Sequence, residues 1–339
     1  MADEIKFNSD STITFGAYTM TFTDDGFEFD GNILATAYEI PWVFQGSSTG
    51  YATGGSYPSA NSNLIRKISF ASDGNSTAGG NLTRGSTALT GHSSSVSGYA
   101  SDHNAIDKFP FADDGNATDV GDLTVSRFQV AGISSTDNGY AAGGRLNPPN
   151  APTNQIDKFP FTSDANATDV GDLTQSRGAV GQSGTEAGYA SGGSTPGGPG
   201  INTIDKFPFA TDANATDVGN LTQATDRAAG QSSDVSGYTS GGWPAGGNTN
   251  RNIIDKFPFA SDGNATDVGN LTQGRGAVGG MSSTESGYSA GGQGMGTPVA
   301  YSNVIDKFSF SSDGNATDVG DLAPGNEGGV TANVGGHQV

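Results

Sequence analysis

Residues 106–123 read IDKFPFADDGNATDVGDL, and this stretch decides the fold because the chain repeats it with few changes. Its opening hexapeptide IDKFPF begins again at three later positions, which are Ile156, Ile204 and Ile254. A variant IDKFSF opens at Ile305, and a degenerate form IRKISF opens at Ile65. These six copies divide most of the chain into units of about 49 residues, a period that indicates a repeat architecture.

Two further markers recur once in each unit. Gly-Tyr followed by small residues, usually ending in Gly-Gly, places tyrosines at Tyr51, Tyr99, Tyr140, Tyr189, Tyr238 and Tyr288. Asp-Val-Gly-Asp/Asn-Leu places leucines at Leu123, Leu173, Leu221, Leu271 and Leu322, and Leu82 takes this place in the first unit. Repeats of this kind bury their surfaces against their neighbours, so the markers identify residues of the contacts between units.

Each unit is predicted to form four short strands and no helix. In the fourth unit we expect strands over residues 177–183, 188–193, 203–209 and 217–222. Residues 211–216 are turn formers of the kind that a tight hairpin requires. Pro208 lacks an amide hydrogen, so we expect it to mark the end of the third strand or a bulge. The longest and most variable inserts follow the Gly-Gly pair.

This order of features resembles the kelch repeat of β-propellers. The matching residues of the fourth unit are Arg177, Tyr189, Gly192, Gly193, Ile204, Phe207 and Leu221. A valine replaces the kelch tryptophan of the fourth strand, at Val120, Val170, Val218, Val268 and Val319. In the second unit Ser101 and Asp102 replace the Gly-Gly pair. The resemblance implies an all-β fold, a six-bladed kelch-like β-propeller with four-stranded blades.

The amino-acid composition, taken alone, indicates a disordered chain rather than a propeller. Leu, Ile, Val and Phe make up only about 17 % of the 339 residues, the net charge is −20, and such values are typical of disordered chains. A propeller resolves the conflict because each blade buries both faces on its neighbours. We expect Phe109, Phe111, Leu123 and their equivalents to form the core between blades. We expect the glycine and alanine strands to lie near the axis, where blades converge.

Residues 1–40 do not share the repeat and are predicted to form a separate β-hairpin or small meander, while residues 41–339 form the propeller. An isolated element of this size is not stable alone, so it should dock on the propeller, on sister chains or on another protein. We expect Phe15, Tyr18, Phe22, Phe27 and Phe29 to carry this attachment or oligomerisation. Two segments compete to supply the first strand that closes the ring: residues 42–46 and residues 328–334.

Several classes of site are disfavoured. The chain has no cysteine, and its three histidines are expected to be scattered surface residues, so we expect no metal site, no cofactor and no catalytic residues. The Asp-Gly-Asn-Ala-Thr-Asp segments at 262–267 and 313–318 superficially resemble a calcium loop, but no glutamate follows at the twelfth place, so we favour turns over a bound cation. The Asp-Lys pairs of the hexapeptide are expected to join neighbouring strands or blades rather than to form a binding ring.

The overall charge and the beginning of the chain limit its partners. A charge of −20 disfavours binding to nucleic acid or to an anionic membrane surface. The first residues, MADEIKF, do not read as a signal peptide, and no segment is long and apolar enough for membrane insertion.

The units differ mainly in the inserts after Gly-Gly, which should gather on one face of the ring. Residues suited to recognition there are Tyr57, Arg145, Trp243, Met295 and Tyr301. The strings IDKFPF, NATDVG and GYASGG resemble those of tail and virion structural proteins of marine bacteriophages. This second resemblance implies a non-enzymatic virion protein, a tail fibre, appendage or decoration.

Such a protein would be made in the host cytoplasm, would be a homo-oligomer, and would bind other virion proteins through residues 1–40. A host cell-surface glycan or receptor is a further expected partner. The alternative is a lectin-like carbohydrate- or receptor-binding propeller outside a virion.

Overall fold

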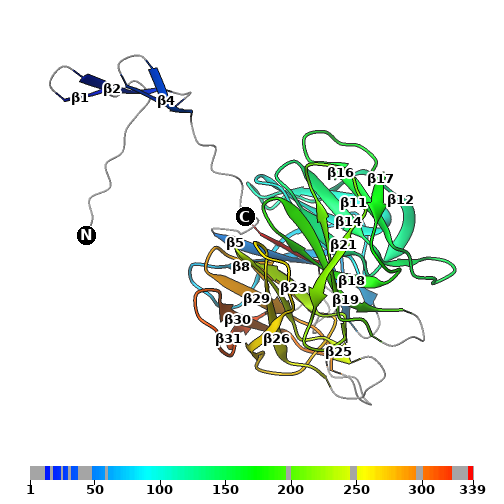
Figure 1. The fold of residues 1–339 in the computed structure, drawn as a ribbon. Helices are drawn as coiled ribbons and strands as arrows, with labels where there is room; N and C mark the ends of the chain where they lie inside the picture. The colour runs from blue at the N-terminus through cyan, green and yellow to red at the C-terminus, as the bar shows by residue number, and fades with distance from the viewer. Residues whose placement is uncertain are drawn as a thin grey trace. The chain divides into compact units, whose positions relative to one another are not determined.

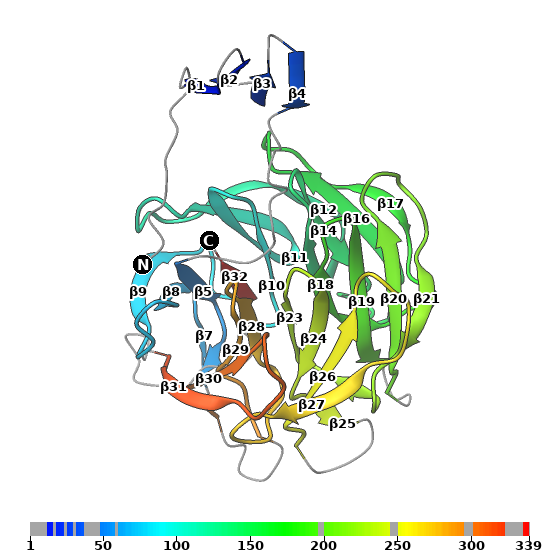
Figure 2. The same cartoon turned by 60° about the vertical axis from the view of Figure 1, so that its left-hand side comes forward.

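The computed structural model describes residues 48–57, 60–195, 200–244, 250–294, 301–322 and 335–338, together with four strands before residue 37. The chain divides into two compact units, Met1–Trp42 and Val43–Val339. The second unit consists of six four-stranded antiparallel sheets arranged as the blades of a β-propeller, which confirms the predicted fold class (Figures 1 and 2).

The blades are numbered here in chain order. Blade one contains β5 (Thr49–Thr53), β8 (Leu64–Ser69) and β9 (Thr77–Asn81), and blade two contains β10 (Thr90–Ser93), β11 (Ser97–Pro110) and β12 (Thr118–Phe128). Blade three contains β13 (Ala131–Ser134), β14 (Asn138–Ala142), β16 (Gln155–Pro160) and β17 (Thr168–Asp172). Blade four contains β18 (Gly178–Ser183), β19 (Ala187–Ser194), β20 (Thr203–Pro208) and β21 (Thr216–Asn220).

The last two blades follow the same plan. Blade five contains β23 (Ala229–Ser232), β24 (Ser236–Ser240), β26 (Ile253–Pro258) and β27 (Thr266–Asn270). Blade six contains β28 (Gly279–Ser282), β29 (Ser286–Ala290), β30 (Val304–Ser309) and β31 (Thr317–Asp321). As predicted, Pro208 ends its strand. Blade two reaches the same shape with the single long strand β11, whose first half pairs with β10 and whose second half pairs with β12.

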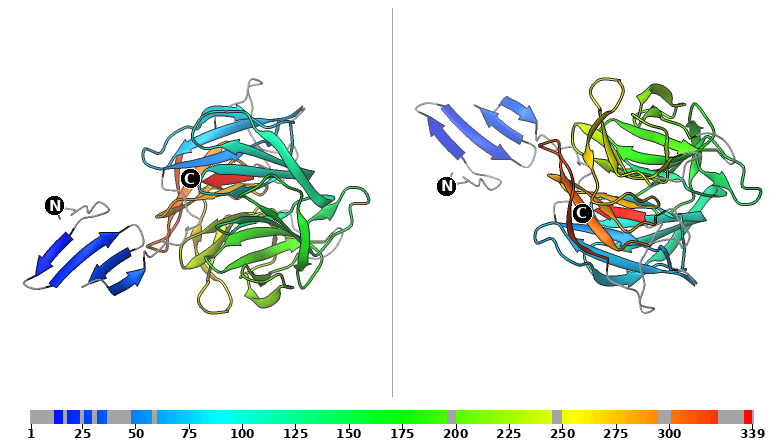
Figure 3. Two further views of the ribbon diagram at one scale, coloured as in Figure 1. Left: turned by 90° about the horizontal axis from the view of Figure 1, so that it is seen from above. Right: turned by 90° about the horizontal axis from the view of Figure 1, so that it is seen from below.

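The ring is closed by the strand β32 (Gly335–Gln338). It pairs antiparallel with β5, matching His337 to Tyr51, and supplies the innermost strand of blade one. It packs between the inner strands β28 and β10, and Figure 3 shows it in red among the inner strands. The closing strand therefore comes from the end of the repeat region but lies at 335–338 rather than at 328–334. The competing residues 42–46 lie outside the described part of the chain.

Aromatic side chains fill the contacts between blades. Tyr99 of blade two stacks on Phe161 of blade three at 4.7 Å between ring centroids and also contacts Phe159. The same arrangement recurs from blade to blade, as between Tyr189 and Phe259. The tyrosine hydroxyl donates a hydrogen bond to the backbone carbonyl of its stacked phenylalanine. The predicted core between blades, including the recurrent tyrosine, is therefore correct.

Glycines let the inner strands approach backbone to backbone around the axis. A Cβ atom on Gly181 would lie 2.1 Å from the carbonyl oxygen of Gly132, and one on Gly230 would lie 2.1 Å from that of Gly181. Two residue positions further along two of these strands, the amide of Ser134 donates to the hydroxyl of Ser183 at 2.9 Å. The same bond joins the other inner strands from blade two to blade six, through Ser93, Ser134, Ser183, Ser232 and Ser282. This crowding explains the small residues of the inner strands.

A second set of contacts joins the blades at the periphery. The hexapeptide lysine of each blade forms an ion pair with a turn aspartate of the next blade, and the six pairs form a closed ring. The pairs are Lys67–Asp114, Lys108–Asp164, Lys158–Asp212, Lys206–Asp262, Lys256–Asp313 and Lys307–Asp73. Beside them the Asn166 side-chain oxygen accepts a hydrogen bond from the Asp122 amide of the preceding blade. These polar residues therefore join blades, as expected of the lysines.

The first unit is a four-stranded antiparallel sheet in the order β1 (Thr12–Phe15), β2 (Tyr18–Thr23), β3 (Gly26–Phe29) and β4 (Asn32–Thr36). Its register matches Phe15 to Tyr18 and Phe22 to Phe27. Directly paired residues share a face of an antiparallel sheet, and so do residues an even number of positions apart. All five predicted attachment residues, Phe15, Tyr18, Phe22, Phe27 and Phe29, therefore belong to one face, and Thr19, Thr21 and Glu28 belong to the other.

Candidate functional site: an axial cavity

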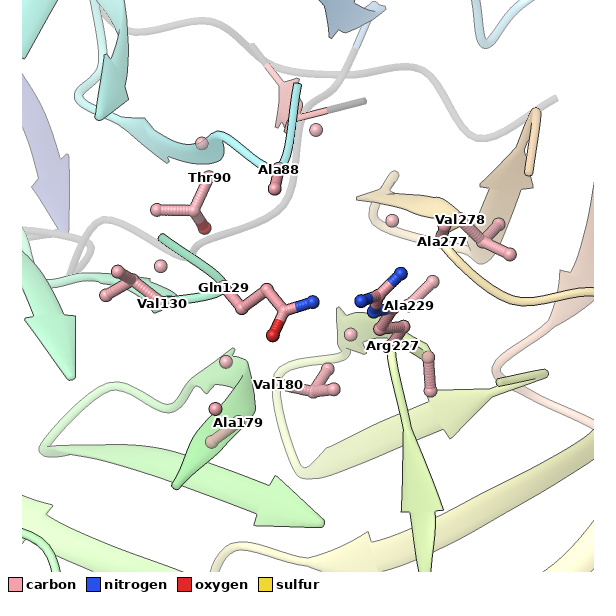
Figure 4. A pocket seen from close by; sticks show the side chains of 18 of the residues that line it. Ala88, Thr90, Gln129, Val130, Ala179, Val180, Arg227, Ala229, Ala277 and Val278 are labelled. Carbon is pink, nitrogen blue, oxygen red and sulfur yellow. The ribbon is translucent and has the colours of Figure 1, made fainter. Parts of the chain in front are cut away.

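The inner strands enclose a cavity of about 130 Å³ on the propeller axis. All six inner strands contribute to its wall, together with the segments that lead into them. Most of the residues that line it are small, as Ala179, Val180 and Val278 illustrate in Figure 4, but its surface mixes apolar side chains with polar groups such as those of Thr90, Asp226 and Ser282. Two long polar side chains, Gln129 and Arg227, point toward one another across the space (Figure 4).

The backbone places these two side chains through a repeated conformation. In four blades the residue five positions before the inner-strand serine has a positive φ: Ala88, Gln129, Arg227 and Ala277, with values from 52° to 60°. This left-handed conformation is uncommon for any residue that carries a Cβ atom. Two blades place alanine here, whereas blades three and five place Gln129 and Arg227. The blades therefore share the backbone conformation and differ in the side chain that it directs at the cavity.

Arg227 is only weakly neutralised. Its Nε lies 3.9 Å from the Asp226 carboxylate, and its guanidinium carbon lies 4.6 Å from the centre of the Trp243 ring. Burial lowers the pKa of Arg227, the neighbouring charge of Arg145 lowers it further, and Asp226 acts in the opposite direction. An arginine nevertheless stays protonated at neutral pH. The part of the cavity beside Gln129 and Arg227, called the mouth here, therefore carries a fixed positive charge in a strongly acidic protein.

Unused hydrogen-bonding groups gather at this mouth. Within the described residues, seven buried side-chain atoms have no hydrogen-bond partner, and three of them are Gln129 Oε1, Arg145 Nε and Arg227 Nε. Arg145 belongs here because it pairs with Phe128, the residue before Gln129. Native proteins leave few buried polar atoms without partners, so such a concentration indicates a place where a ligand or water completes the bonding.

Three of the predicted recognition residues lie around this mouth, because the inserts pair with the segments that enter the inner strands. Arg145 is in β15 (Arg145–Leu146), which pairs with the end of β12, and its guanidinium donates to Ser194 of the next insert. Trp243 is in β25 (Trp243–Pro244), which pairs with β22 (Thr225–Asp226), and its Nε1 donates to the Gln293 carbonyl. Tyr301 forms a bridge with Gln293.

The structure says less about the two remaining predicted recognition residues, Tyr57 and Met295. Tyr57 is in the two-residue strand β6 (Ser56–Tyr57), which pairs with β7 (Ala60–Asn61), and Met295 lies outside the described residues. Gln129 and Arg227 were not predicted. They lie in the short segments before the inner strands, whereas the predicted recognition residues all lie in the inserts. An alignment of the units on the inner-strand serines would reveal them, since it places Gln129 and Arg227 opposite Ala88 and Ala277. The units therefore differ in a second place besides the inserts.

Three further predictions concern chemistry. His92 was expected at the surface, but it is completely buried on an inner strand, where its Nε2 lies 2.8 Å from the Ser101 hydroxyl. Burial lowers the pKa of His92 to about 4. The aspartates of the turns make ion pairs and backbone hydrogen bonds, as Asp113 does with Gly115. In the described part of the chain no group of three or more acidic or histidine residues could hold a metal ion.

Buried charges also occur as ion pairs between an arginine that precedes an inner strand and the hexapeptide aspartate. Arg127–Asp157, Arg177–Asp205 and Arg275–Asp306 are within 3.0 Å and almost wholly inaccessible. Each of these aspartates also accepts hydrogen bonds from a threonine of the preceding blade, as Asp205 does from Thr174. In blade one Arg66 replaces the aspartate and reaches the Gly54 carbonyl. These buried charges are paired with one another, which is typical of structural charges.

Comparison with known proteins supports the fold and no more. No family model and no curated protein matches the sequence. Among the solved structures that match is that of YjhT, which is 15 % identical with a TM-score of 0.60, over 70 % of this chain and 85 % of YjhT. At that identity the likeness concerns the fold alone. Within the described residues, no helix is long and apolar enough to cross a membrane.

Proposed function

We propose that the protein is a non-enzymatic structural protein of a bacteriophage virion, in a tail fibre, an appendage or a decoration. It would display the propeller toward a host surface or other subunits and attach through its N-terminal sheet. The similarity of the repeated strings IDKFPF, NATDVG and GYASGG to those of phage tail and virion proteins motivates the assignment to a virion. The observation that carries the attachment role is the register of the first unit, which assigns five aromatic residues to one face of a single-layered sheet.

A sheet of one layer cannot bury an aromatic face within itself, so stable folding requires a covering partner. The opposite face carries threonine and glutamate and suits contact with water. A second copy of the chain or a neighbouring virion protein would cover the aromatic face. The propeller meanwhile uses its recurrent polar residues in contacts between blades, which supports a rigid displayed body rather than a catalyst.

The test is incorporation into particles. The paired variant Phe22→Asp/Phe27→Asp places two charges on the aromatic face, and the matched control Thr19→Asp/Thr21→Asp places two on the opposite face. We expect the first variant to be absent from purified particles and monomeric in sedimentation, while its propeller melts at the unchanged temperature. Normal incorporation of the first variant would refute attachment through this face. Absence of the unmodified protein from all purified particles would refute the virion assignment.

A second candidate function is a lectin-like module that binds a carbohydrate or receptor through the inserts. The observation in its favour is that Arg145 and Trp243 lie where the inserts pair with the entrance segments of the inner strands, and that Tyr301 bridges Gln293, which itself bridges such a segment at Gly276. Replacing the three inserts that carry them with Gly-Ser segments should abolish binding to host cells or glycan arrays. Equivalent replacement of the hairpin turns at the other end, such as residues 94–96, serves as the control. Binding that survives loss of the inserts would contradict this candidate.

A further inference from the structure

The axial cavity has the features of a binding site and not of a packing defect. A packing defect would be lined by the repeated residues of every blade, whereas this cavity has two unlike polar residues at positions where other blades have alanine. Both adopt a positive φ, at 56° for Gln129 and 52° for Arg227. Ala88 and Ala277 share this conformation, so what distinguishes Gln129 and Arg227 is the long polar side chain that each directs at the cavity.

The chemistry of the walls defines the ligand. The chamber is lined chiefly by alanine, valine and glycine, with Thr90 and Ser282 among them, so it offers both apolar surface and polar groups. Its volume of about 130 Å³ is close to that of a cavity that holds one benzene ring. At the mouth, the planar guanidinium of Arg227 matches the geometry of a carboxylate. The amide of Gln129, pointing at Arg227 from the other side, can donate a hydrogen bond to the same group (Figure 4).

The charge of the site selects an anion. Arg227 has one acidic neighbour, Asp226, at 3.9 Å, which is too far for a hydrogen bond, and Arg145 adds a second positive charge nearby. The Trp243 ring covers the guanidinium and excludes water from that side. We propose that the axial cavity binds a small monocarboxylate, with its carboxylate on Arg227 and Gln129 and its short apolar chain or ring between the inner strands. This site is independent of the proposed attachment to a virion.

The first test compares charged and neutral probes of the same shape on the full chain by ligand-observed NMR titration. Benzoate and butyrate should bind, and benzamide and butyramide should bind at least about tenfold more weakly, because they lose a charged hydrogen bond. Equal affinity for benzoate and benzamide would overturn the proposal, and so would the absence of binding by both carboxylates.

The second test uses variants whose folding the chain itself supports. Arg227→Ala and Gln129→Ala introduce the residue that blades two and six already place at this position, so the local backbone tolerates them. Arg227→Ala should weaken benzoate binding by about tenfold or more, and Ala179→Leu should abolish it by filling the chamber while both polar groups remain. Lys206→Ala removes the same charge from the peripheral ring and should leave the affinity unchanged. Unaltered affinity in Arg227→Ala would overturn the proposal.

Discussion

The guanidinium of Arg177 lies 2.9 Å from the carboxylate of Asp205, and both side chains are completely buried. The same arginine donates to the Gly192 and Ala190 carbonyls, so it links three strands of blade four. Blade five lacks this pair. Thr225 stands where blade four has Arg177, and the described part of the chain gives Asp255 no ion pair. A small cavity of about 10 Å³ lies beside both residues.

Removing one partner of the buried pair should be costly. We expect Arg177→Met to lower the free energy of unfolding by about 3–5 kcal/mol, because it leaves the Asp205 charge buried without a cation. Urea denaturation measures this loss. The control is Asp212→Ala, which removes an exposed ion pair with Lys158 and should cost less than about 1 kcal/mol. Similar losses in the two variants would contradict a structural role for the buried pair.

Restoring the missing pair should stabilise blade five. In Thr225→Arg the new guanidinium can take the place that Arg177 has in blade four, reach Asp255 and donate to the Gly241 carbonyl, which Thr225 now contacts. We expect a gain of about 2 kcal/mol at neutral pH, typical of a hydrogen bond to a charged group. The control Thr225→Met fills the space without charge. If the two variants melt at the same temperature, the pairing is refuted.

The pH dependence of that gain has a defined sign. Burial raises the pKa of Asp255, so the stability that this carboxyl contributes is fully present below its unfolded pKa of about 4 and is lost as the pH rises through the folded pKa. The arginine favours the ionised carboxylate. The difference in melting temperature between Thr225→Arg and the unmodified protein should therefore grow as the pH rises through this range and disappear below it. A constant difference would count against Asp255 as the partner.

His92 should make the propeller sensitive to acid. Its pKa falls from about 6.5 in the unfolded chain to about 4 in the folded one, so the folded state loses stability as the pH falls between these values. The full loss is about 3 kcal/mol. His92→Gln should remove it, because Gln182 and Gln231 occupy the equivalent places in blades four and five and bond to the corresponding serines. Parallel acid unfolding curves for both proteins would exclude His92 as the cause.

The glycines at the axis should not tolerate a side chain. In Gly181→Ala the new Cβ would lie 2.1 Å from the Gly132 carbonyl oxygen, and we expect a loss of about 1–3 kcal/mol as the inner strands separate. The control is Gly263→Ala in a peripheral turn, where a Cβ meets nothing within 4 Å, and stability should change by less than about 0.5 kcal/mol. Thermal unfolding distinguishes the two, and equal melting temperatures would contradict the crowding.

The period of the sequence was sufficient to predict the blades and their aromatic contacts, because every unit repeats the residues that face its neighbours. It also predicted that Pro208 ends a strand, since proline imposes the same local restriction in any context. The burial of His92 was missed because its neighbours belong to another strand and another blade. Gln129 and Arg227 were missed for a different reason. Each occurs at this position in one unit only, and the prediction relied on residues that recur from unit to unit.

The closing strand β32 has a consequence for how the protein is made. Residues 335–338 leave the ribosome after every other described strand, so blade one holds only three strands until synthesis has passed through all six units. Until then the edge of β5 is exposed, and an exposed strand edge readily pairs with another chain. A product that lacks residues 335–338 would thus keep an adhesive edge that the closed ring conceals.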